Sequence, residues 1–399
     1  MSPRVPTVLV CDGGERAALA VVRSLGRAGY RVLVGSAEPR PLAAASRHCV
    51  GNVALPSALS LPEAFCHAVA AAVRLHGIDS VIPIAEPSLL ALSERRGLLG
   101  EAILPFPSAA TTRRVLDKEA VLSAAGSLGI AVPAQVTLHS RRDVAALLEA
   151  PPPMPVVLKP SRSVGEDALG RHKLSVRHVA QRGQLADAIA ALPDAAFPLL
   201  VQQRVVGPGV GVFVLRWDGT TVLRAGHERI LEKPPSGGVS VYRRSVYPDE
   251  LLAAQSDALL EQFEWQGVAM IEFKRDAVTG VPYLMEINGR FWGSLQLAID
   301  ACADFPAHLM ARALGRTPPE TPPFRSGISL RWEWGCVDHL LARLRRTHDE
   351  LSLPPDDLGL VASAARVLLP WRRGERWEVL RLSDPLPFVR ETLRWIGNR

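Results

Sequence analysis

The sequence has few of the features that mark several common protein classes. No stretch approaches the roughly 18 uninterrupted apolar residues that a membrane-spanning helix requires. The first residues run into Thr7-Val8-Leu9-Val10 without the basic and apolar segments of a signal peptide. We therefore expect a cytoplasmic protein with no stable membrane insertion. The length of 399 residues and a hydrophobic content of 48% suit two or three domains with sizeable cores.

Cysteine and lysine are both scarce. The five cysteines lie far apart and no pair has the spacing of a CxxC or zinc motif, which indicates thiols in a reducing compartment. Only five of the 46 basic residues are lysines. The net charge is +6, but the basic residues are scattered among acidic ones, so we expect no nucleic-acid partner.

Two nucleotide-binding fingerprints are missing. GxxxxGK[ST] occurs nowhere in the chain, which excludes a P-loop NTPase. Gly13-Gly14 follows an apolar run but does not form GxGxxG, so it indicates a tight turn more strongly than a dinucleotide site. A Rossmann-type oxidoreductase is therefore a distant alternative.

The first hundred residues alternate between strand and helix patterns. Apolar runs at 8–11 and 31–34 flank a helical pattern at 15–28, and a second helix at 63–75 leads into a strand at 80–84. This order predicts a Rossmann-like domain with a parallel sheet. Further on, a continuous helical pattern covers residues 111–128.

The most informative segment pairs two acidic residues. A turn signal at 276–280 separates two apolar strand patterns and predicts an antiparallel hairpin. In that hairpin Glu272 lies opposite Glu286, and Asn288 emerges on the same face. Two carboxylates and an amide oxygen suit a Mg²⁺-type site with positions open to phosphate oxygens. The alternative is a solvated strand face, but the apolar flanks favour the metal.

Basic residues occur at positions suited to phosphate. Lys159 ends an apolar strand and enters a loop of small polar residues that includes Ser161, and Lys118 lies within the helical pattern of 111–128. Arg290 follows the acidic strand at once and can reach phosphates held by a metal. Each of these, taken alone, can also be a solvated surface charge.

Two loops each allow two interpretations, one functional and one structural. Gln202, Gln203 and Val205 end a strand where a hinge can present backbone groups to an adenine edge, although simple strand termination fits as well. Arg229 precedes a glycine-containing segment at 236–240 that is either a lid over an anionic intermediate or a mobile hairpin.

Together these segments resemble the ATP-grasp superfamily over residues 110–315. The similar pieces are 116–118 with 129–133 (entry motif), 157–160 (second ATP lysine), 200–203 (hinge), and Glu272 with 285–290 (metal-ligand strands). The segments 228–230 and 236–240 are similar to the carbamoyl-phosphate-synthase-like group of predicted carboxylate–amine ligases. Gln203 and Gly209 depart from the family, which often carries acidic nucleotide contacts at these places.

The resemblance implies a fold and a domain order. We expect a Rossmann-like domain at 1–108, then an ATP-grasp fold at 109–316 whose two α+β subdomains, 109–200 and 201–316, clasp ATP. A proline-rich linker and C-terminal extension follow at 317–399. The implied ligands are ATP and Mg²⁺, with Mn²⁺ as a substitute. The resemblance to the family also suggests a homodimer.

The resemblance also implies a reaction. A carboxylate becomes an acyl phosphate, and an amine then forms an amide or peptide bond while phosphate leaves. Lys118, Lys159 and Arg290 would neutralise phosphate charge, and Arg229 would steady the carboxylate or acyl phosphate. The alternatives are a non-catalytic ATP-binding regulatory or assembly protein and a bicarbonate carboxylase.

The sequence does not name the carboxylate or the amine. Glu86 and Arg47 are candidate contacts from the N-terminal domain. The segment containing Trp332 and Trp334 either lines the acceptor pocket or packs the tail onto the core, and we favour packing. A basic aromatic segment at 371–377 suggests contact with a membrane surface or a partner, but it is too short to decide.

Overall fold

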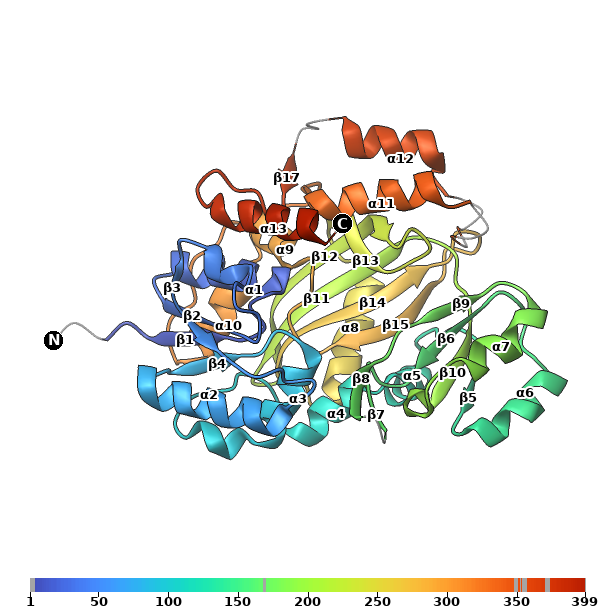
Figure 1. Ribbon diagram of the computed structural model, residues 1–399, viewed down its shortest axis with the longest axis horizontal. Helices are drawn as coiled ribbons and strands as arrows, with labels where there is room; N and C mark the ends of the chain where they lie inside the picture. The colour runs from blue at the N-terminus through green and yellow to red at the C-terminus, as the bar shows by residue number, and fades with distance from the viewer. Residues whose placement is uncertain are drawn as a thin grey trace.

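A computed structural model describes residues 4–167, 170–347, 351, 353, 357–369 and 374–398 (Figure 1). Residues 371–373 of the basic aromatic segment at 371–377 lie outside these ranges. Within the described residues, no helix combines the length and apolar character needed to cross a membrane.

The N-terminal region is a parallel sheet in the order β3-β2-β1-β4. Its strands are β1 (Thr7–Val10), β2 (Arg31–Ser36), β3 (Cys49–Ala54) and β4 (Ser80–Ile82). Its helices are α1 (Arg16–Arg27), α2 (Pro62–His76) and α3 (Glu86–Glu94), with short 3-10 turns η1 (Ala43–Ala45) and η2 (Arg96–Leu99). The expected βαβ arrangement is confirmed. Strand β3 was not anticipated, because its residues alternate between half-buried and exposed positions and lack an apolar run.

Two consecutive helices follow where one continuous helical pattern was expected. They are α4 (Ala109–Leu116) and α5 (Lys118–Ser127). Asp117 separates them with an extended backbone, and its side chain accepts hydrogen bonds from the backbone amides of Glu119 and Ala120. Asp117 is thus the N-cap of α5, and it places Lys118 at the first position of that helix.

A smaller antiparallel sheet comes next, in the order β5-β10-β6-β9. Its strands are β5 (Gln135–Leu138), β6 (Val156–Pro160), β9 (Arg177–Val179) and β10 (Leu199–Gln203). A separate hairpin is formed by β7 (Val164–Asp167) and β8 (Gly170–Lys173). The helical elements are α6 (Val144–Glu149), α7 (Leu185–Ala190), η3 (Arg141–Asp143), η4 (Arg182–Gln184) and η5 (Asp194–Ala196).

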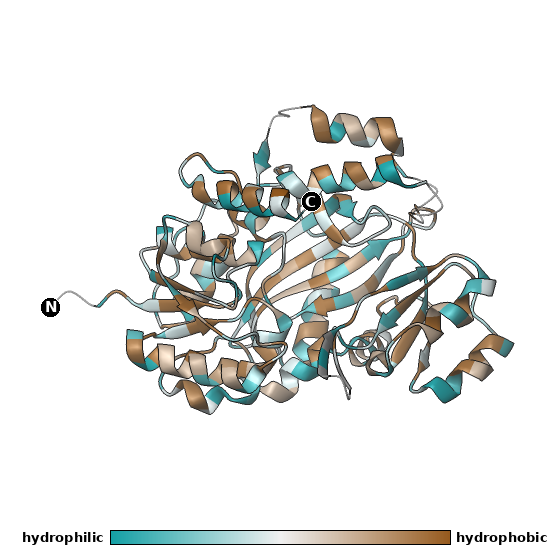
Figure 2. Ribbon diagram, viewed as in Figure 1, coloured by the Kyte–Doolittle hydropathy of each residue, from teal (hydrophilic) through white to brown (hydrophobic). Residues whose placement is uncertain are grey.

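The largest sheet has seven strands in the order β15-β14-β11-β12-β13-β16-β17. They are β11 (Gly209–Trp217), β12 (Thr220–Lys233), β13 (Val239–Val246), β14 (Gly267–Arg275), β15 (Pro282–Asn288), β16 (Ser329–Arg331) and β17 (Glu375–Trp377). Helices α8 (Glu250–Gln262), α9 (Leu295–Asp300) and α10 (Phe305–Ala313) connect them. Hydrophobic and hydrophilic bands alternate along the long strands (Figure 2), as expected when one face is packed and the other meets a polar cavity.

The residues beyond the proline-rich linker continue this same sheet. Strand β16 pairs antiparallel with β13, and β17 pairs parallel with β16. Three helices complete the tail: α11 (Glu333–Arg345), α12 (Gly359–Leu368) and α13 (Leu386–Gly397), which lie together along one side of the molecule (Figure 1).

The hydrophobic core explains how the regions hold together. One continuous cluster of buried side chains includes β1 and β2 of the N-terminal sheet as well as β11 and β14 of the seven-stranded sheet. The small sheet has a separate cluster built around Leu158, Leu185 and Val201. The N-terminal and seven-stranded sheets therefore form one packed body, and the small sheet carries its own core.

Candidate active site

A cavity of about 2240 Å³ is bounded by all regions of the chain. The N-terminal loops, the small sheet, the seven-stranded sheet and the tail all contribute to its walls. Every residue predicted to bind ATP, to bind the metal or to act in catalysis lines it, except Ser161. Those lining residues are Lys118, Lys159, Gln202, Gln203, Val205, Arg229, Glu272, Glu286, Asn288 and Arg290.

The two acidic residues face one another as the hairpin predicts. Strands β14 and β15 pair antiparallel with Glu272 directly opposite Glu286. The Asn288 side-chain amide donates to Glu286 Oε1 at 3.3 Å, and Arg290 donates to Asn288 Oδ1 at 3.3 Å. Burial raises the pKa of Glu272 and repulsion from Glu286 adds to this effect, although Arg229 opposes both. Burial also disfavours the charged form of Glu286, but Lys118, Lys159 and Asn288 together hold its pKa below the ordinary value.

Arg229 reaches the acidic pair because strand β11 has two glycines at this level. Its guanidinium donates to Glu272 Oε2 at 2.5 Å, to Glu232 Oε1 at 2.8 Å and to the carbonyl of Gly238 at 3.1 Å. A Cβ atom on Gly209 would lie 2.8 Å from Arg229 Cδ. A side chain at Gly209 would therefore occupy the space through which Arg229 crosses β11, which gives a physical reason for glycine there.

The two lysines approach the acids from the other side. Lys118 Nζ lies 3.6 Å from Glu286 Oε2 and 3.4 Å from Ser163 Oγ, which accepts its hydrogen bond. Lys159 Nζ donates to Gln202 Oε1 at 2.7 Å. Burial lowers the pKa of Lys159 to about 8, while Glu286 partly offsets that effect. Both ammonium groups thus face the two carboxylates within one cavity.

The comparisons with known proteins agree with this arrangement. A family model described as "ATP-grasp in the biosynthetic pathway with Ter operon" matches residues 196–336. The L-amino acid ligase from Bacillus licheniformis superposes with a TM-score of 0.60 at 19% identity, covering 80% of this chain and 76% of its own. Residues 196–336 thus match an ATP-grasp family model, and the chain has the ATP-grasp fold.

Two further solved structures share its fold. N5-carboxyaminoimidazole synthase from Aspergillus clavatus, in complex with ADP and 5-aminoimidazole ribonucleotide, has a TM-score of 0.59 at 20% identity, covering 79% of this chain and 78% of its own. Biotin carboxylase from Campylobacter jejuni has a TM-score of 0.61 at 15% identity, covering 82% and 74%. No curated protein sequence matches the chain. The expected fold class is confirmed: a parallel α/β sheet followed by the antiparallel ATP-grasp sheets.

Ser161 is placed differently from the other predicted site residues. It is buried, its hydroxyl donates to Asp117 Oδ1 at 2.8 Å, and its carbonyl accepts from the Lys118 amide at 2.9 Å. Its polar groups therefore hold the start of α5 in place. Ser163, two residues further on, lines the cavity and contacts Lys118 instead.

The hinge residues lie at the end of β10. Gln202 is buried between Lys159 and Gln135, whose Oε1 accepts from Gln202 Nε2 at 3.0 Å. The Gln203 backbone amide donates a hydrogen bond to the carbonyl of Ala134 at 2.8 Å, and the Gln203 side chain is exposed. Val205 is buried in the cavity wall, and within the described ranges its amide donates to no other group. The Val205 amide is therefore a donor of this segment that no described group uses.

The two candidate substrate contacts from the N-terminal domain lie in different parts of the structure. Glu86, at the start of α3, is buried in the cavity wall, and burial raises its pKa while Lys118 and Arg290 oppose that effect. Arg47 lies elsewhere: its guanidinium donates to the carbonyl of Ser383 and its backbone amide to Asp384. Glu86 therefore belongs to the site region, whereas Arg47 helps to attach the tail.

Sequence reasoning missed part of the cavity wall. Trp332 both packs against the hydrophobic core and lines the cavity, and Trp334 also lines it, so the two alternatives for this segment are not exclusive. His227, Ser240, Trp292 and Ser294 line the cavity as well. His227 and Ser240 reach the wall through the pairing of β12 with β11 and β13, and Trp292 and Ser294 lie in the segment between β15 and α9.

The donor set fits a divalent cation. Two carboxylates lie side by side and disfavour one another's ionisation, a repulsion that a bound cation would relieve. Their hard oxygen atoms are the type that Mg²⁺ prefers. Among the residues with described positions, no group of three or more His, Cys, Asp or Glu side chains could hold a metal. The third protein ligand would therefore be the amide oxygen of Asn288.

Proposed function

We propose that this protein uses ATP to activate a carboxylate as an acyl phosphate and joins it to an amine, releasing ADP and phosphate. One observation carries the proposal: the opposed Glu272 and Glu286 share a cavity with Lys118, Lys159 and two arginines. Ligand pockets commonly enclose about 300–1,000 Å³. The cavity of about 2240 Å³ is thus large enough for a nucleotide and two further substrates.

The bonding changes follow the ordinary chemistry of phosphoryl transfer. A carboxylate oxygen forms a bond to the γ-phosphorus while the bond to the bridging β,γ-oxygen breaks, and ADP leaves. The amine then forms the C–N bond, the C–O bond to phosphate breaks, and the amine proton passes to solvent. Glu272, Glu286 and Asn288 would hold Mg²⁺, which would reduce the negative charge of the phosphate oxygens.

The chain's own side chains account for binding and orientation. Lys118 and Lys159 place two positive charges opposite the acidic pair, where they can neutralise phosphate oxygens. Arg290 is held by Asn288 and by the carbonyl of Phe291, so its guanidinium is oriented before a substrate binds. Arg229 is fixed by two carboxylates, and their attraction keeps its pKa high despite burial. It remains a guanidinium cation at every practical pH.

The decisive experiment is hydroxamate formation with ATP, Mg²⁺, hydroxylamine and pooled amino and other carboxylic acids. Hydroxylamine traps an acyl phosphate without the natural amine. We expect a coloured product that is lost in Glu286→Gln. Glu228→Gln is the matched control, because Glu228 lies on β12, pairs with Arg244 and is not among the cavity-lining residues.

Three possible results of this assay distinguish the ligase function from its alternatives. Product in wild type and Glu228→Gln, but not in Glu286→Gln, supports carboxylate activation at the acidic pair. ATP binding without turnover of any acid favours a regulatory ATP-binding protein. Failure to bind ATP would show that the assignment of this cavity to the nucleotide is wrong.

A further inference from the structure

Helix α13 of the tail presents an apolar side to the cavity. Leu386, Val389 and Leu393 line the cavity, and their side chains are 62%, 50% and 67% exposed. Their spacing of three and four residues places them on one side of the helix, and Ile396 continues that side with 59% exposure. A contiguous exposed apolar surface commonly marks a binding site. This side of α13 is therefore a candidate surface for an apolar ligand.

A different side of α13 packs the helix onto the rest of the tail. The Trp334 ring of α11 stacks on Trp395 with centroids 4.1 Å apart and on Phe388 with centroids 6.2 Å apart. Trp334 Nε1 also donates to Thr392 Oγ1 at 3.0 Å. Positions 388, 392 and 395 recur at helical spacing and form a side distinct from the apolar one. The apolar side is therefore not the one that attaches α13 to α11.

A loop of the N-terminal region lies next to this helix. Arg390 donates to the carbonyl of Pro41 at 2.9 Å, and Arg394 donates to Glu38 Oε2 at 3.0 Å. This loop and the one that follows β3 also contribute apolar residues to the cavity wall, namely Ala37, Pro39, Leu42, Leu55 and Leu59. We call the part of the cavity that is lined by these five residues and by Leu386, Val389 and Leu393 the apolar arm.

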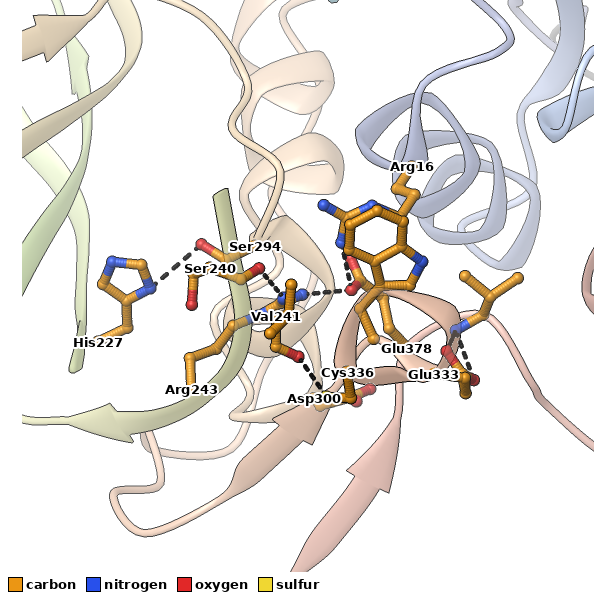
Figure 3. A network of polar contacts seen from close by, with 12 residues as sticks. Arg16, His227, Ser240, Val241, Arg243, Ser294, Asp300, Glu333, Cys336 and Glu378 are labelled. Carbon is orange, nitrogen blue, oxygen red and sulfur yellow. Dashed lines mark hydrogen bonds and ion pairs between the residues drawn. The ribbon is translucent and has the colours of Figure 1, made fainter. Parts of the chain in front are cut away.

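Buried ion pairs fix the segment that leads into α13. Glu378, which directly follows β17, lies 2.5 Å from both Arg16 of α1 and Arg243 of β13, and Figure 3 shows it between the two guanidinium groups. Asp384, two residues before α13, accepts from Arg23 at 2.8 Å. The apolar arm is therefore formed before a ligand binds, and a preformed surface loses less free energy to ordering on binding.

The position of the apolar arm indicates what it binds. It is continuous with the cavity that contains Glu272, Glu286 and the two lysines, whereas α13 lies beyond residues 196–336, the range that matches the family model. A molecule whose reacting end lies near the acidic pair can therefore place an attached hydrocarbon group in the arm without leaving the cavity. Such a group would cover Leu386, Val389 and Leu393 but not Ile396, which is not among the cavity-lining residues.

We propose that the apolar arm binds a hydrocarbon group of one of the two substrates that this protein joins. The ligand class is a carboxylic acid or an amine that carries an aliphatic chain of several carbon atoms. Leu386, Val389 and Leu393 then determine specificity, because they contact the chain and not the reacting atoms. The inference rests on the proposed function, since it assigns a substrate-selecting part of the same cavity.

Chain length is the variable in the first test. The hydroxamate reaction is run with acetate, butanoate, hexanoate and octanoate, and with glycine, 2-aminobutanoate and 2-aminohexanoate. We expect kcat/KM for the acid to rise about two- to fourfold for each methylene group that enters the arm, while the KM for ATP stays constant.

A second series distinguishes the amine from the acid as the source of the chain. It runs from methylamine to hexylamine with one acid that the protein activates, and the amide is measured by mass spectrometry. A rise in the acid series assigns the arm to the acid, and a rise in the amine series alone assigns it to the amine. Flat profiles in both series would overturn the inference.

Leu393→Gln and its matched control Ile396→Gln test the residues of the arm. Both positions lie on the same exposed side of α13, so each variant should keep its thermal midpoint within about 2 °C, but only Leu393 lines the cavity. Leu393→Gln should lower kcat/KM for the longest substrate about tenfold and leave that for the shortest unchanged. Ile396→Gln should change neither. Equal losses in both variants would overturn the inference, because a docking surface for a membrane or a second chain would use both residues alike.

Titration calorimetry tests the arm without turnover. The protein is held with Mg²⁺ and a non-hydrolysable β,γ-imido analogue of ATP, and the titrants are hexanoate, 2-aminohexanoate and hexylamine, compared with acetate, glycine and methylamine. At least one six-carbon compound should bind about tenfold or more tightly than its short counterpart, and Leu393→Gln should remove most of that difference. Equal affinities within every pair, or no binding of any six-carbon compound, would refute the inference even if hydroxamate forms. A preference for the longer chain without hydroxamate would retain the apolar arm and reject only the ligase reaction.

Discussion

ATP binding should weaken as the pH rises above 8, and Lys159 is the reason. Burial lowers the pKa of this lysine to about 8 in the nucleotide-free protein, although Glu286 and Glu272 partly counteract burial. Phosphate oxygens favour the protonated ammonium, so binding restores the pKa towards the ordinary value near 10.5. Above pH 8 the nucleotide must therefore bind together with a proton.

The magnitude follows from this difference in pKa. The neutral fraction of Lys159 is about one tenth at pH 7 and about nine tenths at pH 9, so the affinity for ATP should fall about tenfold, or about 1.4 kcal/mol. A lysine with an ordinary pKa would give almost no change over this range. The direction of both effects follows from the lowered pKa: the affinity for ATP falls as the pH rises, and the protein takes up a proton when ATP binds.

Isothermal titration calorimetry in two buffers of different ionisation enthalpy measures both quantities. The proton uptake per ATP should approach one at pH 9 and should be small at pH 7. Lys159→Arg is the control, since arginine stays charged and its affinity should be flat between these values. An equally flat wild-type profile would refute the reasoning, because it would mean that Lys159 remains protonated without nucleotide.

Three further substitutions probe the site and its supports, and a fourth, Ser108→Ala, is a control for the third. Gly209→Ala should displace Arg229 from the acidic pair and reduce turnover about ten- to a hundredfold, with little change in the thermal midpoint. Glu378→Gln leaves two guanidinium groups without their shared carboxylate and should cost about 3–5 kcal/mol in denaturant unfolding; an unchanged midpoint would show that the ion pairs contribute nothing. Asp117→Ala should cost about 1 kcal/mol and also weaken ATP binding through the adjoining lysine. Ser108→Ala, which removes the cap of α4, should lower stability alone.

Local patterns predicted the acidic hairpin well. The turn between β14 and β15 has a short, clear signal, and a hairpin's turn determines which residues face each other. The pairing of Glu272 with Glu286 is therefore readable without a structure and is confirmed here. The βαβ start of the chain is readable for the same reason, since its apolar runs are separated by short turns.

Longer-range features were not readable. His227 gains its position from Gly211 on the neighbouring strand, and no property of residues 226–228 indicates that. Strands β16 and β17 have three residues each, too few for a periodic pattern. Strand β16 forms on the edge of β13, and β17 forms in turn on the edge of β16. Asp117 interrupts a helical pattern by capping the next helix, which a pattern of apolar spacing does not reveal.

Contacts between the C-terminal tail and the N-terminal region determine at which stage of chain synthesis the cavity can form. The ion pair between Arg16 and Glu378 joins residues 362 positions apart, and Arg23 meets Asp384 across a similar separation. Closing so long a loop costs only about 2 kcal/mol more than closing one a tenth as long. Forming it, however, requires that nearly the whole chain be present.

During synthesis the N-terminal sheet and the acidic hairpin can fold early, but the wall contributed by α13 cannot. A newly made chain would therefore assemble its phosphate-binding groups first and enclose them last.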